Sequence, residues 1–311
     1  MEKTPLIFIA QVLTALLLAP LLPGITSRVK AVFAGRHGKP LLQLYYDLAK
    51  LLKKGEVISS ATTWVFSAGP AVSLASAFLA LLLLPLGGMP SPLAFTGDFL
   101  LFAYLLGMGR FATVLAAVDT GSAFEGMGAS REAFLGGITE PVLFLCFLAL
   151  INTASSMGLP ADLSLSSLFC GFPAHAWFSG RPELLLLAFV MGVILLVENC
   201  RIPVDDPTTH LELTMIHEVM VLDHSGINLA FILYGSSLKL WIFASLLAGL
   251  IIPDMPPLAH TAVTIISLFL IAAGVGVVES VMARLRMPVV PAFIGLAGAV
   301  AAFVLILTLV R

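Results

Sequence analysis

Charged residues are scarce in this sequence: Asp, Glu, Lys and Arg together make up 11% of the 311 residues. A soluble protein of this length needs a polar surface, and about a quarter of its residues are normally charged. Hydrophobic residues instead make up 59% of the chain, and the mean hydropathy is +1.05. This composition excludes a soluble globular enzyme and a disordered region, and it predicts a protein solvated by lipid.

Cysteine and clustered positive charge are also in short supply. The three cysteines, Cys146, Cys170 and Cys200, lie far apart and form no CxxC pair. They cannot build an iron–sulfur or zinc cage by themselves, and they imply no disulfide framework. The net charge of −2 and the lack of a long basic tract exclude a nucleic-acid binder. We therefore expect no metal, cofactor or redox centre within this chain.

Long apolar runs, by contrast, are abundant. A hydrocarbon core about 30 Å thick is crossed by roughly 20 apolar residues in an α-helix. The apolar residues are continuous rather than alternating, which indicates helices and not the strands of a barrel. Eight runs qualify, at about 5–24, 64–88, 98–118, 134–156, 183–200, 227–252, 259–282 and 289–310. The sequence thus predicts an all-α integral membrane protein with about eight transmembrane helices, forming one domain over residues 1–311.

Lysine and arginine are distributed unevenly between the predicted loops. Those in the odd-numbered loops are Arg28, Lys30, Arg36, Lys39, Lys50, Lys53, Lys54, Arg131, Arg201, Arg284 and Arg286, whereas the even-numbered loops and the termini hold Lys3, Arg181 and Arg311. Basic loops face the cytoplasm. We therefore expect a multi-pass protein of the cytoplasmic (inner) membrane with both termini on the outer side. Loops 25–63, 119–133 and 201–226 are long enough to form a structured cytoplasmic face.

The first cytoplasmic loop contains a predicted amphipathic helix at about 41–58. Its apolar and charged faces are formed, respectively, by Leu41, Leu44, Leu48 and Leu51 and by Asp47, Lys50 and Lys54. Two interpretations fit this pattern. The helix lies on the membrane surface, or it forms a docking surface for a soluble partner.

Five ionisable residues lie within the apolar runs: Arg110, Glu140, Glu198, Lys239 and Glu279. Each costs about 2.5–3.5 kcal/mol at the centre of a bilayer on insertion scales. They either form ion pairs that stabilise packing or line a pathway for protons or cations. The second interpretation is favoured because the five residues lie on five different spans. In addition, Glu140 and Glu198 are expected near the charge-rich cytoplasmic side.

The segment 198–226 is the richest in titratable residues. His210, His217 and His224 recur every seven residues and would share one face of a continuous helix, which Asp205 or Asp206 would cap ahead of Pro207. No HExxH motif follows His217, so a metal site is not expected. A solvated acidic helix and the wall of a partly buried, titratable chamber remain as alternatives. The candidate path residues here are Asp205, Asp206, Glu212, His217, Glu218 and Asp223.

Several motifs together resemble one protein family. ENCRIPVDDP (198–207) resembles the E-x-x-R-x-P-x-D signature of the membrane protein known as subunit 1 in NADH–quinone oxidoreductase, respiratory complex I. DTGSAFEGMGASREAFLGGITEP (119–141) resembles its second signature, a Gly-x-Ser-Arg-Glu loop that leads to a membrane glutamate. GRHGKPLLQLYYDLAKLLKKGEV (35–57) and VESVMARLRMP (278–288) fit as well. The resemblance covers about residues 24–290.

Details of these motifs point to one branch of the family. DTGSAF and VMARLRMP look like the homologous subunit of group 4 membrane-bound [NiFe] hydrogenases, which include formate hydrogenlyase-type complexes. Complex I proteins usually carry a longer Gly-Pro-Asn-Arg stretch where this chain has GRHGKP. They also carry a Glu-x-Glu pair where this chain reads DPTTHLELT. The wall of the quinone chamber is therefore altered in this sequence.

The resemblance also implies roles for particular residues. The family motifs are matched by Glu140, Glu198, Arg201, Asp205, the Arg131–Glu132 pair and, approximately, Glu212. In the family they form an acidic chain between a chamber beneath the catalytic subunits and the ion-pumping membrane arm. The complete candidate coupling path adds Asp206, His217, Glu218, Asp223, Lys239 and Glu279, with Arg110, Arg131 and Arg201 as charge-tuning residues.

The resemblance places the cofactors in partner subunits. A [NiFe] centre and iron–sulfur clusters are expected in a hydrogenase-like large subunit and an iron–sulfur small subunit on the cytoplasmic face, with antiporter-like subunits in the membrane. The expected function is that of a non-catalytic subunit that anchors the redox arm and couples it to proton or sodium translocation. One alternative is the quinone-site subunit of a complex I-like dehydrogenase. A more remote one is a stand-alone ion-coupled transporter, although the sequence shows no internal repeat typical of that class.

Overall fold

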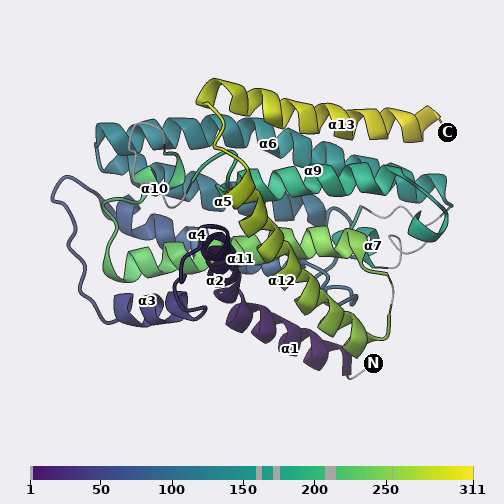
Figure 1. Ribbon diagram of the computed structural model, residues 1–311, viewed down its shortest axis with the longest axis horizontal. Helices are drawn as coiled ribbons and strands as arrows, with labels where there is room; N and C mark the ends of the chain where they lie inside the picture. Colours follow the sequence, from purple (N-terminus) through teal and green to yellow (C-terminus); the bar gives the residue numbers. More distant parts are fainter. Residues whose placement is uncertain (1–2, 159–162, 171–175, 207–214, 254, 311) are drawn as a thin grey trace.

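The computed structural model describes residues 3–158, 163–170, 176–206, 215–253 and 255–310, and its regular elements are helices (Figure 1). They are α1 (Lys3–Leu18), α2 (Leu21–Phe33), α3 (Gln43–Leu51), α4 (Trp64–Leu83), α5 (Asp98–Asp119), α6 (Ala123–Ser156), α7 (Leu165–Phe169), α9 (Glu183–Glu198), α10 (His217–Met220), α11 (Gly226–Ile251), α12 (Pro257–Val281), the 3-10 helix η1 (Met287–Val289) and α13 (Val290–Val310). The predicted all-α membrane fold is confirmed.

Six helices are long and apolar enough to cross a membrane: α4, α5, α6, α11, α12 and α13. The pair α1 and α2 forms a seventh candidate, which is bent by 41° where the two helices meet. Helix α9 has 16 residues, or about 24 Å at 1.5 Å per residue, and corresponds to the remaining predicted span. The count of eight spans stays a prediction.

Most of the predicted loop 119–133 is helical in the structure. Helix α5 continues to Asp119 and α6 begins at Ala123, so only residues 120–122 connect them. The polar composition of this stretch suggested a loop, but its small residues allow α6 to pack closely instead. A Cβ atom on Gly128 would lie 2.3 Å from Val219 Cγ1 of α10. Close helix packing therefore extends α6 well beyond its apolar run.

The N-terminal region also differs from the sequence-based prediction. The run 5–24 is divided between α1 and α2, with Pro20 immediately before α2, and α2 extends into the predicted loop 25–63. Within that loop, α3 confirms the helix expected inside 41–58. None of the α3 residues is buried. Helix α3 therefore lies at the edge of the molecule rather than in its core.

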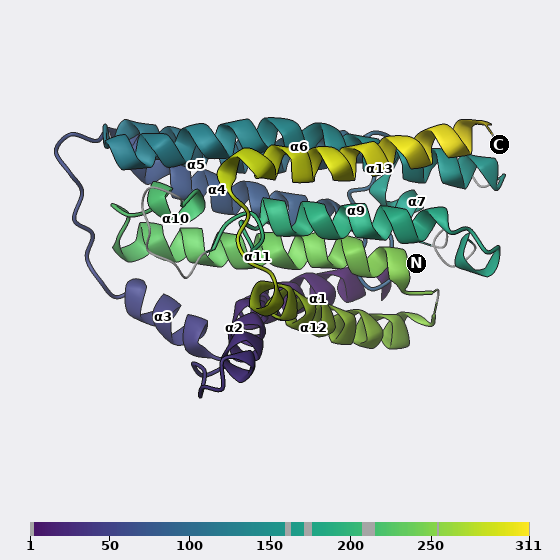
Figure 2. The same ribbon diagram turned by 45° about the horizontal axis from the view of Figure 1, so that its top comes forward.

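The long helices α4, α5, α6, α9, α11 and α13 run roughly parallel, and α12 crosses them obliquely (Figures 1 and 2). Helix α11 is central, since 67% of its apolar window is buried, compared with 22% for α12. Both termini lie at one end of the bundle, near α7, and α3 and α10 lie at the other. This arrangement places the predicted cytoplasmic elements together at one end, which we call the α3–α10 end.

Candidate functional site

Glu198, the last residue of α9, lies at the centre of a buried group of charges. Its side chain is 5% exposed and contacts two cations from other helices. Arg110 of α5 donates a hydrogen bond to Glu198 Oε1, and Lys239 Nζ of α11 lies 2.9 Å from Oε2. Arg110 Nε also lies 3.5 Å from Glu132 Oε1 of α6. These four residues, the Glu198 network, are formally neutral, which offsets part of the cost of removing each charge from water.

A cavity of about 80 Å³ adjoins this network. Arg110, Glu132, Glu198 and Lys239 line it, together with polar groups of Ser73, Ser76, Thr113, Asn199, His217 and Ser236. A cavity needs roughly 10–15 Å³ to admit one water molecule, and buried water requires polar partners. Both conditions are met, so the cavity suits several water molecules in contact with titratable side chains.

Glu140 faces the same network from α6. With Arg110 and Glu198 it lines a smaller cavity of about 10 Å³, and its side chain is half-buried. Among the described residues, no ion pair is formed by Glu140. The expectation that it lies near the cytoplasmic end of its span stays a prediction. Because α6 begins at Ala123, Glu140 lies about halfway along the helix.

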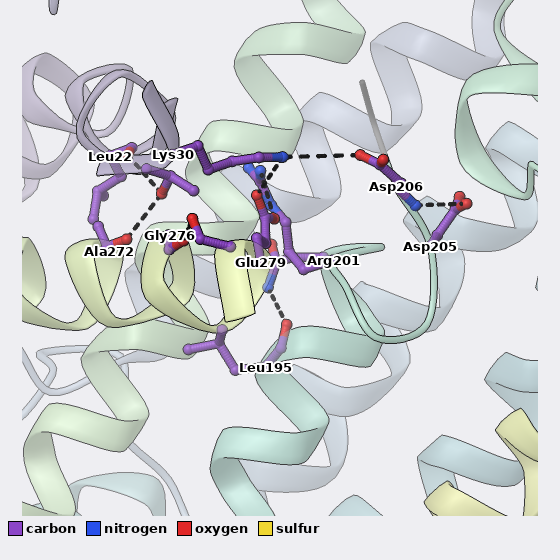
Figure 3. A network of polar contacts seen from close by, with 12 residues as sticks. Leu22, Lys30, Leu195, Arg201, Asp205, Asp206, Ala272, Gly276 and Glu279 are labelled. Carbon is purple, nitrogen blue, oxygen red and sulfur yellow. Dashed lines mark hydrogen bonds and ion pairs between the residues drawn. The ribbon is translucent and has the colours of Figure 1, made fainter. Parts of the chain in front are cut away.

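Glu279 of α12 organises a second group of charges (Figure 3). Its side chain is 0% exposed, with Oε2 2.9 Å from Lys30 Nζ of α2 and Oε1 3.3 Å from Arg201 Nη1. Lys30 Nζ also lies 3.9 Å from Asp206 Oδ1. These residues form the Glu279 network, which again pairs two cations with two carboxylates.

Asp205 anchors the segment 198–206, which lies between the Glu198 and Glu279 networks, to neighbouring parts of the chain. Its Oδ1 lies 2.8 Å from Arg284 Nη2, while Oδ2 accepts hydrogen bonds from the backbone N–H groups of Ile216 and His217, at 3.0 and 3.1 Å. Asp205 therefore binds the start of α10, whereas the helix that its spacing suggested, beginning at Pro207, lies outside the described residues. His210 and Glu212 lie outside the described residues.

The segment 198–206 joins the two networks. Glu198 belongs to one, and Arg201 and Asp206 belong to the other. Only a few backbone bonds separate them. A displacement or charge change in the segment therefore acts on both networks, and this segment is the one identified by the ENCRIPVDDP motif.

The other candidate residues are more dispersed. Arg131 Nη1 donates to the carbonyl oxygen of Met215 at 2.9 Å, which holds α6 against the segment before α10. Glu218 is half-buried and Asp223 is exposed. The backbone N–H of Asp223 donates to Glu125 Oε1 at 3.2 Å. These contacts do not bring Glu218 or Asp223 into either network.

The seven-residue spacing does not place His217 and His224 on one helical face. Helix α10 ends at Met220, so no continuous helix joins His217 to His224. His217 lines the cavity beside Glu198. His224 is buried elsewhere and its ring stacks on Phe66, with ring centroids 4.0 Å apart. Among the described residues, no group of three or more His, Cys, Asp or Glu side chains is arranged to hold a metal ion.

Two cations, one in the Glu279 network and one paired with Asp205, were not singled out in the sequence. Lys30 and Arg284 counted only toward orientation. The four-residue spacing of Leu22, Thr26 and Lys30 places them on one face of a helix, and this spacing could have indicated that Lys30 points inward. In the structure, Leu22 and Thr26 on that face of α2 are fully buried. Another buried carboxylate, Asp98, accepts hydrogen bonds from Ser164 and Leu165, and so holds α7 against α5.

His224 makes stability depend on pH. Burial lowers the pKa of His224 to about 4, although the Asp223 carboxylate opposes this shift. An unfolded histidine titrates near 6.5. Between about pH 6.5 and 4 the unfolded chain therefore binds a proton that the folded chain does not bind, and the stabilisation present above pH 6.5 is lost as the pH falls.

We expect His224→Phe, which keeps the aromatic stack on Phe66 and removes the titrating group, to weaken this pH dependence. Thermal unfolding of the purified protein should be followed at pH 7.5 and pH 5.0. The melting temperature of the unaltered protein should fall more between these values than that of the variant. Equal falls would show that proton binding by His224 is not linked to unfolding.

Comparisons with known proteins agree with this architecture. The family model described as NADH dehydrogenase matches residues 6–310. The chain is 32% identical over 286 residues to hydrogenase-4 component C of Escherichia coli (strain K12), which covers 89% of this chain and 87% of that protein. It is 31% identical over 289 residues to formate hydrogenlyase subunit 4 of the same organism, which covers 90% and 91%.

A solved structure gives the same result for the fold. A chain of the membrane-bound sulfane sulfur reductase, an archaeal respiratory membrane complex, superposes with a TM-score of 0.79 and 19% sequence identity, covering 98% of this chain and 99% of that one. Nearly the whole chain is therefore accounted for by one membrane fold. The protein belongs to the NADH dehydrogenase family, that of the membrane protein known as subunit 1 in respiratory complex I, and is homologous to hydrogenase-4 component C and formate hydrogenlyase subunit 4.

Proposed function

We propose that this protein is the membrane-anchoring and energy-coupling subunit of a membrane-bound [NiFe] hydrogenase-type redox complex. It would link a cytoplasmic redox arm to translocation of protons or sodium ions. The observation that carries this proposal is the Glu198 network beside a cavity large enough for water. Charges in a membrane interior are costly and usually mark ion pathways. We propose a hydrogenase-type complex because the two bacterial relatives are named as components of hydrogenase-4 and formate hydrogenlyase.

The coupling mechanism follows from the formal neutrality of the networks. Adding or removing one proton leaves an uncompensated charge, which favours proton movement at a neighbouring carboxylate. A redox-linked charge change near the α3–α10 end would act first on the segment 201–206. Through Arg201 and the short connection to Glu198 it would reach the cavity and then Glu140. Asp205 and Asp206 thus serve as the receiving end of the path.

Partner subunits supply the redox chemistry in this proposal. A [NiFe]-hydrogenase-like large subunit and an iron–sulfur small subunit would bind at the α3–α10 end, and antiporter-like subunits would bind within the membrane. Exposed apolar side chains at Leu41, Leu42, Tyr46 and Leu52 suit either docking or contact with the membrane surface. We further propose that this end faces the cytoplasm and that both termini face the other side.

The geometry favours ion movement over the two alternative functions. Ligand pockets usually measure about 300–1,000 Å³, whereas the cavity beside Glu198 measures about 80 Å³. It therefore fits water and protons better than a quinone headgroup. A stand-alone transporter gains no support from the two bacterial relatives, which are by name components of larger complexes.

Purification of the affinity-tagged chain from native membranes tests the proposed assembly. We expect it to carry along an iron–sulfur small subunit and a hydrogenase-like large subunit in equal amounts, with iron that leaves with these partners when the complex is dissociated. Iron analysis before and after dissociation gives the measurement. Stoichiometric iron in the separated chain, or recovery of the chain without any redox partner, would contradict the proposal.

A further inference from the structure

A polar cluster distinct from the Glu198 and Glu279 networks lies towards the end of the bundle that holds the termini. Four of its side chains come from three helices: Gln11 of α1, Trp241 and Ser245 of α11, and His260 near the start of α12. They are 6%, 3%, 8% and 7% exposed, respectively. Neither network described above includes them. Buried polar groups in a membrane protein require internal partners, because the hydrocarbon supplies none.

Three atoms of this cluster have no such partner among the described residues. They are Gln11 Oε1, Trp241 Nε1 and Ser245 Oγ. The remaining groups are held in place: Gln11 Nε2 donates to Thr261 Oγ1 at 3.0 Å, and Thr264 Oγ1 lies 3.2 Å from His260 Nδ1. An unsatisfied buried donor or acceptor costs about 1–3 kcal/mol. Three unsatisfied atoms in one cluster indicate that each has a hydrogen-bonding partner other than the described side chains.

Two cavities of about 20 Å³ each lie against these atoms. Gln11, Trp241, Ser245 and Thr261 line one of them. Ser245, His260 and Thr264 line the other, and both Ser245 and Thr264 belong to the two cavities. Each cavity exceeds the roughly 10–15 Å³ that one water molecule needs, and each offers several hydrogen-bonding groups.

The chemistry of the lining selects water over a metal cation. The indole N–H of Trp241 is a donor only and cannot coordinate a cation, whereas water accepts from it. Water also donates to Gln11 Oε1, and the Ser245 hydroxyl can take either role. Each orphaned atom thereby gains a partner.

The turn at Gly87 and Gly88 closes the site. Both glycines have positive φ angles, 55° and 72°, which side chains disfavour. A Cβ atom would lie 2.4 Å from Gln11 Nε2 at Gly87 and 2.7 Å from His260 Cδ2 at Gly88. The backbone therefore approaches the polar side chains closely and leaves room only for small molecules.

We propose that the two cavities bind water molecules and that this water hydrates the outer half of an ion route whose inner half is the Glu198 network. Trp241 and Ser245 follow Lys239 on α11 by two and six residues, or about 3 and 9 Å along the helix. The site therefore lies farther along α11 than Lys239, towards the end that holds the termini, and on a different face of the helix. The second part of the proposal rests on the proposed coupling function, whereas water binding does not.

X-ray radiolysis of the purified complex in H2¹⁸O tests water binding directly, because radicals formed from bound water label adjacent side chains. We expect ¹⁸O at Trp241 and none at Phe147, which is 0% exposed and lines neither cavity. Ser245→Val removes one of the two hydroxyls shared by the cavities and fills part of both, so labelling at Trp241 should be lost. Labelling of Trp241 no higher than that of Phe147 would overturn the whole proposal.

A matched pair of variants tests the role in ion movement. Thr264→Val and Thr153→Val each remove a buried or half-buried hydroxyl that donates to the carbonyl four residues earlier, at 2.8 and 2.7 Å, but only Thr264 lines a water cavity. We expect Ser245→Val and Thr264→Val to lose ion translocation in vesicles while redox turnover continues, and Thr153→Val to retain both.

Water binding and the role in the ion route can be disproved separately. Loss of Trp241 labelling with undiminished translocation in Ser245→Val would overturn the role in the route, while the Glu198 network would still be open to its own test. If Ser245→Val prevents assembly of the complex, ion translocation by Thr264→Val tests the role in the route instead, because valine has nearly the same shape as threonine.

Discussion

Replacing Glu140 by Gln leaves the complex assembled and abolishes ion translocation: this is the expected result if the Glu198 network belongs to an ion path. Glu140 shares a cavity with Arg110 and Glu198 but forms no ion pair among the described residues. Its neutralisation therefore strands no buried cation. Glutamine keeps the shape and the hydrogen-bonding groups of the side chain while it removes the group that carries a proton.

Three measurements on the Glu140→Gln variant separate these effects: the yield of purified complex, redox turnover with a soluble dye, and ion translocation in membrane vesicles. Thr153→Val is a control on the same helix, since it removes a buried hydroxyl that donates to the Ala149 carbonyl oxygen and lies outside both networks. It should retain all three. Normal assembly with undiminished translocation in Glu140→Gln would leave the coupling proposal without support, and lost assembly would indicate a structural role.

Glu198→Gln should behave differently, with a severe loss of assembled complex. Glu198 contacts both Arg110 and Lys239, and its side chain is 5% exposed. Breaking a buried ion pair from one side costs about 3–5 kcal/mol, because the partner charge stays buried. A typical folded domain is stable by only about 5–15 kcal/mol. We therefore expect the same chemical change to be tolerated at Glu140 and not at Glu198.

A second substitution tests this explanation. Lys239→Met in the Glu198→Gln background removes one stranded cation and leaves Arg110 near Glu132, so complex yield should partly recover. The yields of the unaltered protein, the two single variants and the double variant form a double-mutant cycle, which isolates the interaction between the two side chains. Near-normal yield of Glu198→Gln alone, or no recovery in the double variant, would show that this pair does not stabilise the complex.

Much of the fold followed from local features of the sequence. Low charge and continuous apolar runs predicted a helical membrane protein, and the leucine spacing in 41–58 predicted the helix that includes α3. The five charges within the runs were found because each is costly in lipid whatever surrounds it. The motifs around Glu198 and Arg131 also pointed to the family that the comparisons confirm.

The sequence alone did not determine which charges meet or how deep they lie. Glu279 contacts Lys30, which had seemed an ordinary loop cation, and Glu140 lies halfway along a helix that begins earlier than its apolar run. The sequence determined the burial cost of each residue, because hydropathy and periodicity depend on neighbours in the chain. The tertiary structure decided the partners, since ion pairs and cavities form between helices distant in sequence, whose relative positions depend on the packing of the whole bundle.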